Sequence, residues 1–244
     1  VDSTDYKDDL SHLFRFSSTH EDTEDQKVSL KDYVERMPES QKSIYYVIAD
    51  SYMTAKSSPH LEIFRKKNIE VLLLSEPIDE WVTTHLSEFD SKKLQSVNKG
   101  ELDLGDIQDE DEKKKDKDKE SNKAHDELVK RIKDILDEKV KEVRVTSRLT
   151  TSPACLVSDD NDMGRHLEQI LKASGQNIPG SKPILEINPD HPIIKKIDGE
   201  KDNDLFTDWS HILFDQALLS EGGQLADPVN FVNKLNAMIV SMTK

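Results

Sequence analysis

Two side chains lie where catalytic groups are often found, in or directly after apolar segments. Asp50 follows the apolar segment 43–49, and Cys155 lies inside the apolar run 154–157. An aspartate at a strand end is more often a turn or helix-capping residue than a catalytic acid. A cysteine in an apolar strand is more often a small buried hydrophobe than a nucleophile, because no histidine accompanies it in a recognisable signature. We therefore predict no catalytic residue at either position.

Signatures of phosphate and metal binding are also missing from the sequence. The turns that follow the two most apolar segments, at 49–52 and 74–77, contain no glycine. A phosphate cradle needs a glycine-rich loop before a helix, so we predict no nucleotide site. The eight histidines show no metal-ligand spacing, and neither Gly-x-Ser-x-Gly nor a paired-carboxylate signature is present. We predict no catalytic residue, no metal and no cofactor in this chain.

Composition restricts the partners. The chain has 49 acidic and 34 basic side chains and a formal net charge of −15, which disfavours nucleic acid and membrane surfaces as partners. The longest apolar run, residues 71–74, is too short to span a bilayer. One cysteine cannot form an internal disulfide, which fits a reducing compartment.

The elements that would position any site begin with an α/β pattern in residues 1–98. Segments 43–49 and 69–74 lack polar alternation, which is typical of strands buried on both faces. A helix between them implies a parallel, right-handed crossover. The other expected elements are a helix from Ser29 to Pro38, a helix opened by Pro59, a helix after Pro77 and a strand at 94–97. We predict a small α/β/α layered domain with a short parallel sheet.

Residues 99–123 form a charged linker. Between Glu101 and Glu120, 10 acidic and 5 basic residues leave too few apolar side chains for a core. The segment is expected to act as a spacer, and its sequence is compatible with a solvated single helix or with disorder.

Residues 124–244 have an α+β pattern. Leu128, Ile132 and Leu136 form one helical stripe, and 143–149 alternates as a strand with one buried face. Segments 154–157 and 184–187 are expected to join that strand in an antiparallel sheet.

Met163, Leu167 and Ile170 share one face of a short helix between acidic and Gly/Pro-rich loops. In most proteins such a stripe packs in the core. Between these loops, however, an exposed adhesive face is an equal alternative, and both interpretations stay open.

The chain ends in a predicted helical hairpin. Residues 205–219 are apolar around more than half of the helix, and Asp227-Pro228 opens a second amphipathic helix. One neighbour cannot cover so wide a surface, so we expect a homodimer through a four-helix bundle. The predicted interface side chains are Leu213, Ala217, Leu218, Leu235, Met238 and Ile239.

Several stretches, in order along nearly the whole chain, resemble the heat-shock protein 90 molecular chaperones, and most closely their bacterial members. They read LFRFSST at 13–19, SLKDYVERM at 29–37, IYY at 44–46, SSPHLE at 57–62, EVLLL at 70–74, IDEW at 78–81, EFD at 88–90, RL at 148–149, SPA at 152–154, EINPDH at 186–191 and DQALL at 215–219. Each motif alone is weak, but their order makes a chance resemblance very improbable.

The resemblance implies a C-terminal portion of the chaperone: the end of the middle domain at 1–98, the linker at 99–123 and the dimerisation domain at 124–244. In the family, ATP and Mg²⁺ bind in the N-terminal domain, so no ATPase activity is expected in this chain. The chain ends without the C-terminal peptides of eukaryotic members, which implies a bacterial cytoplasmic protein.

The resemblance also implies client-binding residues. Glu80 and Trp81 match the family's acidic-tryptophan helix, and Thr84 stands where the bacterial pattern has Asn. Met163 and Leu167 match the amphipathic helix in placement, and Ile170 extends its stripe, although this helix is less Met-rich than in the family. We also expect Trp81 to be partly exposed, with Ile78, Val82 and Leu86 of the same helix buried.

Three functions follow for testing. The leading one is a non-catalytic chaperone portion that dimerises and binds partly folded clients, with other chaperones as further partners. The alternatives are a scaffold that only dimerises and a small-molecule or phosphoryl-transfer enzyme that uses the α/β domain.

Overall fold

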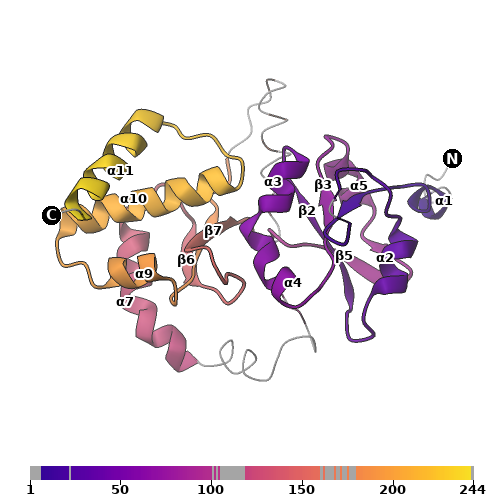
Figure 1. Ribbon diagram of the computed structural model, residues 1–244, viewed down its shortest axis with the longest axis horizontal. Coiled ribbons are helices and arrows are strands. Elements are labelled where there is room, and N and C mark those ends of the chain that lie inside the picture. Colours follow the sequence, from indigo (N-terminus) through magenta and orange to yellow (C-terminus); the bar gives the residue numbers. More distant parts are fainter. Residues whose placement is uncertain are drawn as a thin grey trace.

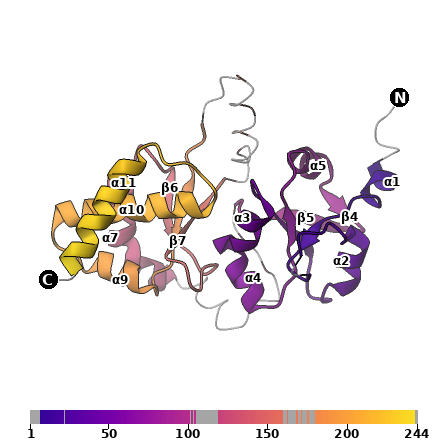
Figure 2. The ribbon, with the colours of Figure 1, turned by 45° about the horizontal axis from the view of Figure 1, so that its top comes forward.

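The computed structural model describes residues 7–242 except 22, 101, 103, 105–118, 160–161, 163–167, 169–170, 172–174 and 176–179. The described chain forms two lobes along its long axis (Figure 1). The lobes remain distinct when the molecule is turned by 45° (Figure 2). The first lobe contains α1 to β5, and the second contains α7 to α11.

The first lobe is built on a five-stranded sheet in the order β1-β3-β2-β5-β4. The strands are β1 (Ser17–Ser18), β2 (Ser43–Ile48), β3 (Leu72–Leu74), β4 (Glu88–Phe89) and β5 (Lys92–Ser96). The central strand β2 pairs in parallel with both β3 and β5, whereas the edge strands β1 and β4 pair antiparallel to their neighbours. The predicted parallel crossover is confirmed, but the two short antiparallel edges carry no pattern long enough to be read from sequence.

Helices cover both faces of this sheet. They are α1 (Lys7–Ser11), α2 (Leu30–Arg36), α3 (Tyr52–Ser57), the 3₁₀ turn η1 (Pro59–Leu61), α4 (Glu62–Lys66) and α5 (Asp79–His85). One core layer joins Tyr45 and Val47 to α3 and α4, and the other joins Ile44 and Leu72 to α2 and Leu86. The α/β/α layering is therefore confirmed.

Helix α2 begins as expected. The Ser29 hydroxyl accepts from the Asp32 N–H at 3.0 Å, and the Asp32 carboxylate accepts from the Ser29 N–H at 3.0 Å. This reciprocal pair is a capping box, and it satisfies two backbone donors that the helix itself leaves unpaired.

The second lobe packs helices against a three-stranded sheet. Its elements are α7 (Lys119–Ile135), β6 (Glu142–Val145), β7 (Ala154–Val157), β8 (Ile184–Ile187), α9 (Pro192–Asp198), α10 (Asn203–Ser220) and α11 (Pro228–Met242). Leu128, Ile132 and Leu136 all lie in the core, so the predicted stripe is confirmed. This lobe is α+β, as the sequence indicated.

The expected antiparallel sheet needs one correction. The order is β6-β8-β7, so β8 lies between the two strands that are neighbours in sequence. It pairs in parallel with β6 and antiparallel with β7. All four residues of β8 are buried, and a strand buried in this way suits the central position of the sheet.

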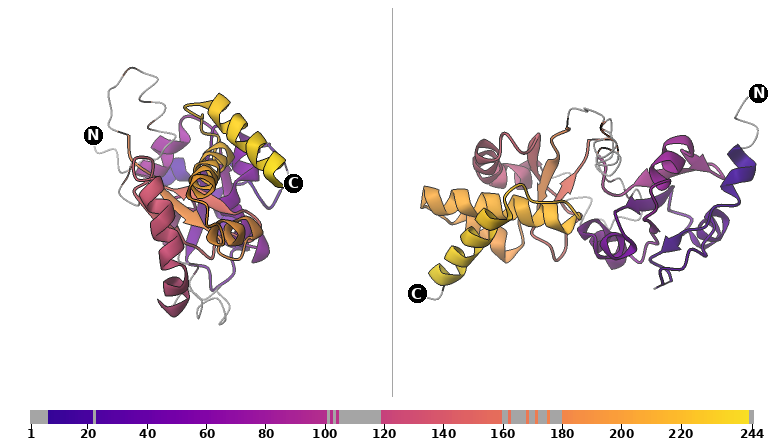
Figure 3. Two further views of the ribbon diagram at one scale, coloured as in Figure 1. Left: turned by 90° about the vertical axis from the view of Figure 1, so that its left-hand side faces the viewer. Right: turned by 90° about the horizontal axis from the view of Figure 1, so that it is seen from above.

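The two C-terminal helices form the predicted hairpin, with α11 crossing over α10 (Figure 3). Asp227 accepts from the Asn230 N–H at 2.9 Å, which confirms the predicted cap. Helix α10 contacts β7, α7, α9 and α11 of its own chain, which bury most of its apolar side chains, whereas Leu205 and Leu219 are 37% and 45% exposed. Helix α11 folds back onto α10 and covers most of the face that we expected a second protomer to cover, and the homodimer itself stays a prediction. Among the described helices, none has the length and apolar character needed to cross a bilayer.

Candidate functional site

Helix α5 presents two large apolar side chains to solvent. Trp81 is 49% exposed, as predicted, and Ile78 directly before the helix is 59% exposed. The expectation that Ile78 is buried is wrong, because the chain turns into the helix at this residue and Asp79 takes the inward position. The Asp79 carboxylate accepts from the Glu76 N–H at 2.8 Å and so closes that turn.

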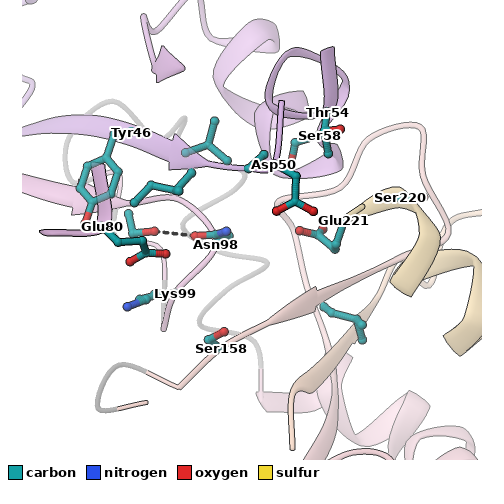
Figure 4. A pocket seen from close by; sticks show the side chains of 15 residues that line it. Tyr46, Asp50, Thr54, Ser58, Glu80, Asn98, Lys99, Ser158, Ser220 and Glu221 are labelled. Carbon is teal, nitrogen blue, oxygen red and sulfur yellow. Dashed lines mark hydrogen bonds between the residues drawn. The ribbon is translucent and has the colours of Figure 1, made fainter. Parts of the chain in front are cut away.

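Glu80, which the family resemblance implied as a client-binding residue, is buried. It is 5% exposed, whereas Thr84 is exposed and donates its hydroxyl to the Glu80 carbonyl at 2.6 Å. Glu80 helps to line a small cavity between the two lobes, together with Tyr46 and Lys99 (Figure 4). Burial raises the pKa of the Tyr46 hydroxyl, a hydrogen bond with Thr83 lowers it, and the Glu80 charge raises it, for a net increase.

This junction cavity, of about 50 Å³, is lined by both lobes. In Figure 4 the carboxylates of Asp50, shortly after β2, and of Glu221, directly after α10, point toward each other. A side chain on Gly222 would bring its Cβ to 3.2 Å from Thr54 and 3.5 Å from the Asp50 carboxylate, and Gly222 has a φ of +77°. Glycine at this position therefore lets the end of α10 approach α3 closely.

Backbone hydrogen bonds connect the two lobes across the junction. The Ser158 N–H, directly after β7, donates to the Asn98 carbonyl at 3.1 Å, and the Gly100 N–H donates to the Ser158 carbonyl at 2.9 Å. Fully buried His60 places Nε2 2.9 Å from Oε1 of Glu221 on the second lobe.

A buried arginine strengthens the same connection. The Arg148 guanidinium donates to the Val97 carbonyl at 2.8 Å and to the Gly100 carbonyl at 2.9 Å. Its Nε lies 2.7 Å from Glu186 Oε2, and Arg144 lies 2.7 Å from the other oxygen of the same carboxylate. Because Glu186 is buried, these cations supply the pairing that a buried carboxylate requires.

Glu62 on α4 holds the turn before β7. Its Oε2 accepts from the N–H groups of Thr150, Thr151 and Ser152 at 2.6, 2.7 and 3.2 Å, and Oε1 accepts from the Ser152 hydroxyl at 2.6 Å. Burial alone would raise the pKa of Glu62, but the hydrogen bonds from Ser152, Thr151 and Thr150 lower it to about 2. We call these contacts the Glu62 latch. Sequence reasoning missed it and Arg148, because neither depends on a local pattern.

The predicted interface side chains divide by burial. Leu213, Ala217 and Met238 are buried in the chain's own core, and Leu218 packs partly against it. Leu235 is half-buried, whereas Ile239 is 53% exposed. Leu213, Ala217 and Met238 thus leave no side-chain area for a second protomer in this arrangement. Helix α11 does carry exposed apolar side chains that a second protomer could cover. They are Val229, Val232, Ile239 and Val240, which we call the α11 stripe.

Met163, Leu167 and Ile170 lie outside the described residues, so the two interpretations of their stripe remain predictions.

The two residues considered as catalytic candidates have structural surroundings. Asp50 follows β2, and α3 begins two residues later with Ser51 as its cap. Burial raises the pKa of the Cys155 thiol well above its ordinary value, which keeps it protonated. In the part of the chain that the structure describes, no three His, Cys, Asp or Glu side chains are grouped to hold a metal ion.

Comparison with known proteins identifies the family. The sequence model described as "Hsp90 protein" matches residues 1–244. The chain is 55% identical over 236 residues to "Chaperone protein HtpG" of Nitrosococcus oceani, which covers 97% of this chain and 37% of that protein. It is 53% identical to the protein of the same name from Pseudoalteromonas translucida, covering 98% of this chain and 37% of that protein. The chain thus spans about 37% of the length of these curated relatives. It belongs to the heat-shock protein 90 family.

Proposed function

We propose that this chain is the dimerising and client-binding portion of an ATP-dependent chaperone of the bacterial cytoplasm. Its relatives carry the name of a chaperone, and the chain spans about a third of their length. ATP and Mg²⁺ would act elsewhere in the whole protein, and this chain would have no ATPase activity of its own. Other chaperones are further proposed partners.

The observation that carries the proposal is the pair of exposed apolar side chains at Ile78 and Trp81. A fully covered tryptophan buries roughly 150 to 250 Å², so a side chain that is half exposed still offers roughly 100 Å² to a partner. At about 25 cal/mol per Å², covering that area yields about 2 to 3 kcal/mol. Apolar patches of this kind bind partly folded proteins, which expose apolar side chains of their own.

The second surface is the α11 stripe. Its four side chains lie on one face of a helix whose other face is held in the core by Met238, so the stripe is fixed in place. In a two-fold dimer the same stripe would meet itself, and each covered Val or Ile would contribute about 1.5 kcal/mol or more. The proposed dimer therefore uses Ile239 as predicted and adds Val229, Val232 and Val240.

Client binding is tested by titrating the chain into a fluorescently labelled, permanently unfolded protein and following anisotropy. Trp81→Ala and Ile78→Ser should each weaken binding several-fold. Met53→Ala is the matched control, because Met53 is an apolar side chain that is 63% exposed and lies on α3, and this variant should bind as the unsubstituted chain does.

Equal binding by Trp81→Ala and Met53→Ala would contradict the client site. A chain that dimerises but does not bind the unfolded protein would instead support the scaffold alternative.

A further inference from the structure

The segment that carries the proposed client surface contains acidic residues and no basic ones. Residues 68–91, which include Ile78 and Trp81, have six Asp or Glu side chains and neither Lys nor Arg. An apolar patch in such a segment favours a partner that brings the positive charges itself. The inference that follows rests on the proposed function and concerns the chemistry of the client.

Four of these six acids have roles within the fold, so they do not count toward the charge that a client meets. Glu70 accepts from Arg36, Asp79 and Glu80 are buried, and Glu88 lies opposite Lys93 in the β4–β5 pair. The other two, Glu76 and Asp90, are exposed. Glu76 lies two positions before Ile78, whereas Asp90 lies in the turn between β4 and β5.

Glu76 and a neighbouring loop form an acidic rim beside Ile78. The Glu76 carboxylate accepts from the Gln26 side-chain amide at 3.4 Å, and this neutral partner does not cancel its charge. The same contact brings the loop before Gln26 next to the patch. That loop adds the exposed Glu24, whereas Asp25 forms an ion pair with Lys27. We call Glu24 and Glu76 the acidic rim.

The exposed indole of Trp81 favours a cation for an independent reason. Tryptophan is the side chain whose ring face attracts a Lys or Arg cation most strongly. Among the described residues, the rings that hold such a cation are those of Tyr52, Phe206 and Phe214, and Trp81 is not one of them. A cation supplied by a client therefore has both an aromatic face and a carboxylate rim to contact.

We propose that the client segments bound at Ile78 and Trp81 are apolar residues flanked by lysine or arginine. The apolar residue covers Ile78 and part of the indole, and the neighbouring cation meets the acidic rim or the ring face of Trp81. Each such contact at an exposed position changes affinity by about two- to fivefold. Because the charges are exposed, added salt weakens the preference.

The test uses the 244-residue chain and labelled, unstructured peptides that share the same phenylalanine and leucine residues but are flanked by lysine, glutamine or glutamate. Anisotropy titrations at low salt should show the lysine peptide binding about threefold or more tighter than the glutamine peptide, and the glutamate peptide binding most weakly. In about 1 M salt, where the Debye length is about 3 Å, the three affinities should converge.

Two double variants separate the acidic rim from the net charge of the chain. Glu24→Gln/Glu76→Gln should reduce the preference for the lysine peptide about twofold or more. Asp126→Asn/Glu127→Gln is the matched control, because it removes two charges from exposed positions on α7 in the second lobe, and it should keep the full preference. A preference that both variants keep, or that both lose equally, would overturn the inference.

Trp81→Ala distinguishes this inference from the client site itself. It should weaken binding of the glutamine peptide several-fold. If it does so while the lysine and glutamine peptides bind the unsubstituted chain equally, the client site stands and the charge preference is wrong. If Trp81→Ala binds every peptide as the unsubstituted chain does, the client site is wrong, and the inference that rests on it is overturned with it.

Discussion

Replacing Glu62 with glutamine tests whether the Glu62 latch holds the two lobes together. The substitution keeps the shape of the side chain and removes its charge. The three N–H groups of residues 150–152 would then face a neutral amide in place of a carboxylate, and hydrogen bonds to a charged group are the stronger kind.

The size of the effect follows from the pKa. A decrease in the pKa of Glu62 from 4.5 to about 2 corresponds to a stabilisation of about 3.4 kcal/mol at most, because each pKa unit is worth about 1.4 kcal/mol. Because Glu62 is only partly buried, solvent screens this interaction, and we expect Glu62→Gln to lower the free energy of unfolding by about 1 to 2 kcal/mol at pH 7.

The pH dependence has a defined sign. The folded-state pKa lies below the unfolded value, so the carboxylate stabilises the folded chain fully above about pH 4.5. That contribution is lost as the pH falls toward 2. The difference between Glu62→Gln and the unsubstituted chain should therefore shrink between pH 5 and pH 3.

Urea unfolding followed by far-UV circular dichroism measures both effects. Glu35→Gln is the control, since Glu35 is exposed and its pair with Lys31 is 3.8 Å long, so it should change stability by less than about 0.5 kcal/mol. A Glu62→Gln chain as stable as the control at pH 7, or a difference that grows on acidification, would refute the reasoning.

Three other outcomes follow from the same structure. Arg148→Met should destabilise the chain by about 3 kcal/mol or more, because it leaves the buried Glu186 carboxylate with one cation fewer, and a melting temperature equal to that of the unsubstituted chain would contradict this. Trp81→Ala should cost about 1 kcal/mol or more in binding of an unfolded client while the melting temperature stays within about 2 °C, whereas a large decrease would show that Trp81 serves the core. Cys155 should react with a thiol reagent only as fast as the chain unfolds, and rapid labelling under native conditions would show that the thiol is accessible.

The sequence predicted best what local patterns determine. The Ser29 cap, the Asp227 cap, the buried strand β2 and the stripe of Leu128, Ile132 and Leu136 all depend on residues within a few positions of one another. Such features require no knowledge of which elements meet in space.

The errors arose where distant elements compete for the same surface. The position of β8 between β6 and β7 depends on a pairing across about 40 residues. The residue pattern of a strand does not indicate which other strand it will pair with. The hairpin of α10 and α11 was predicted, but the apolar surface of α10 did not reveal how much of it α11 would cover. At α5, the helical period left open which face turns inward, so Ile78 was expected to be buried but is exposed, and Glu80, implied as a client-binding residue, is buried.

The candidate functional residues show the same contrast between local patterns, which the sequence predicts, and long-range contacts, which it does not. Exposure of Trp81 was predicted from its neighbours on one helix, whereas the Glu62 latch and the Arg148 contacts join segments more than 45 residues apart. Their residues appear in the motifs that carry the family resemblance, but motif membership does not reveal what a side chain contacts.

The α11 stripe is tested most directly by multi-angle light scattering of the chain at micromolar concentration. We predict a mass of twice the 27.9 kDa of one chain. Ile239→Asp with Val232→Asp should return it to the mass of a single chain, because each buried carboxylate would face its own copy across the two-fold axis. Asn230→Asp, which adds the same charge at an exposed position at the side of the stripe, should leave the dimer intact. A single-chain mass for the unsubstituted protein, or a dimer that survives both aspartates, would contradict the account.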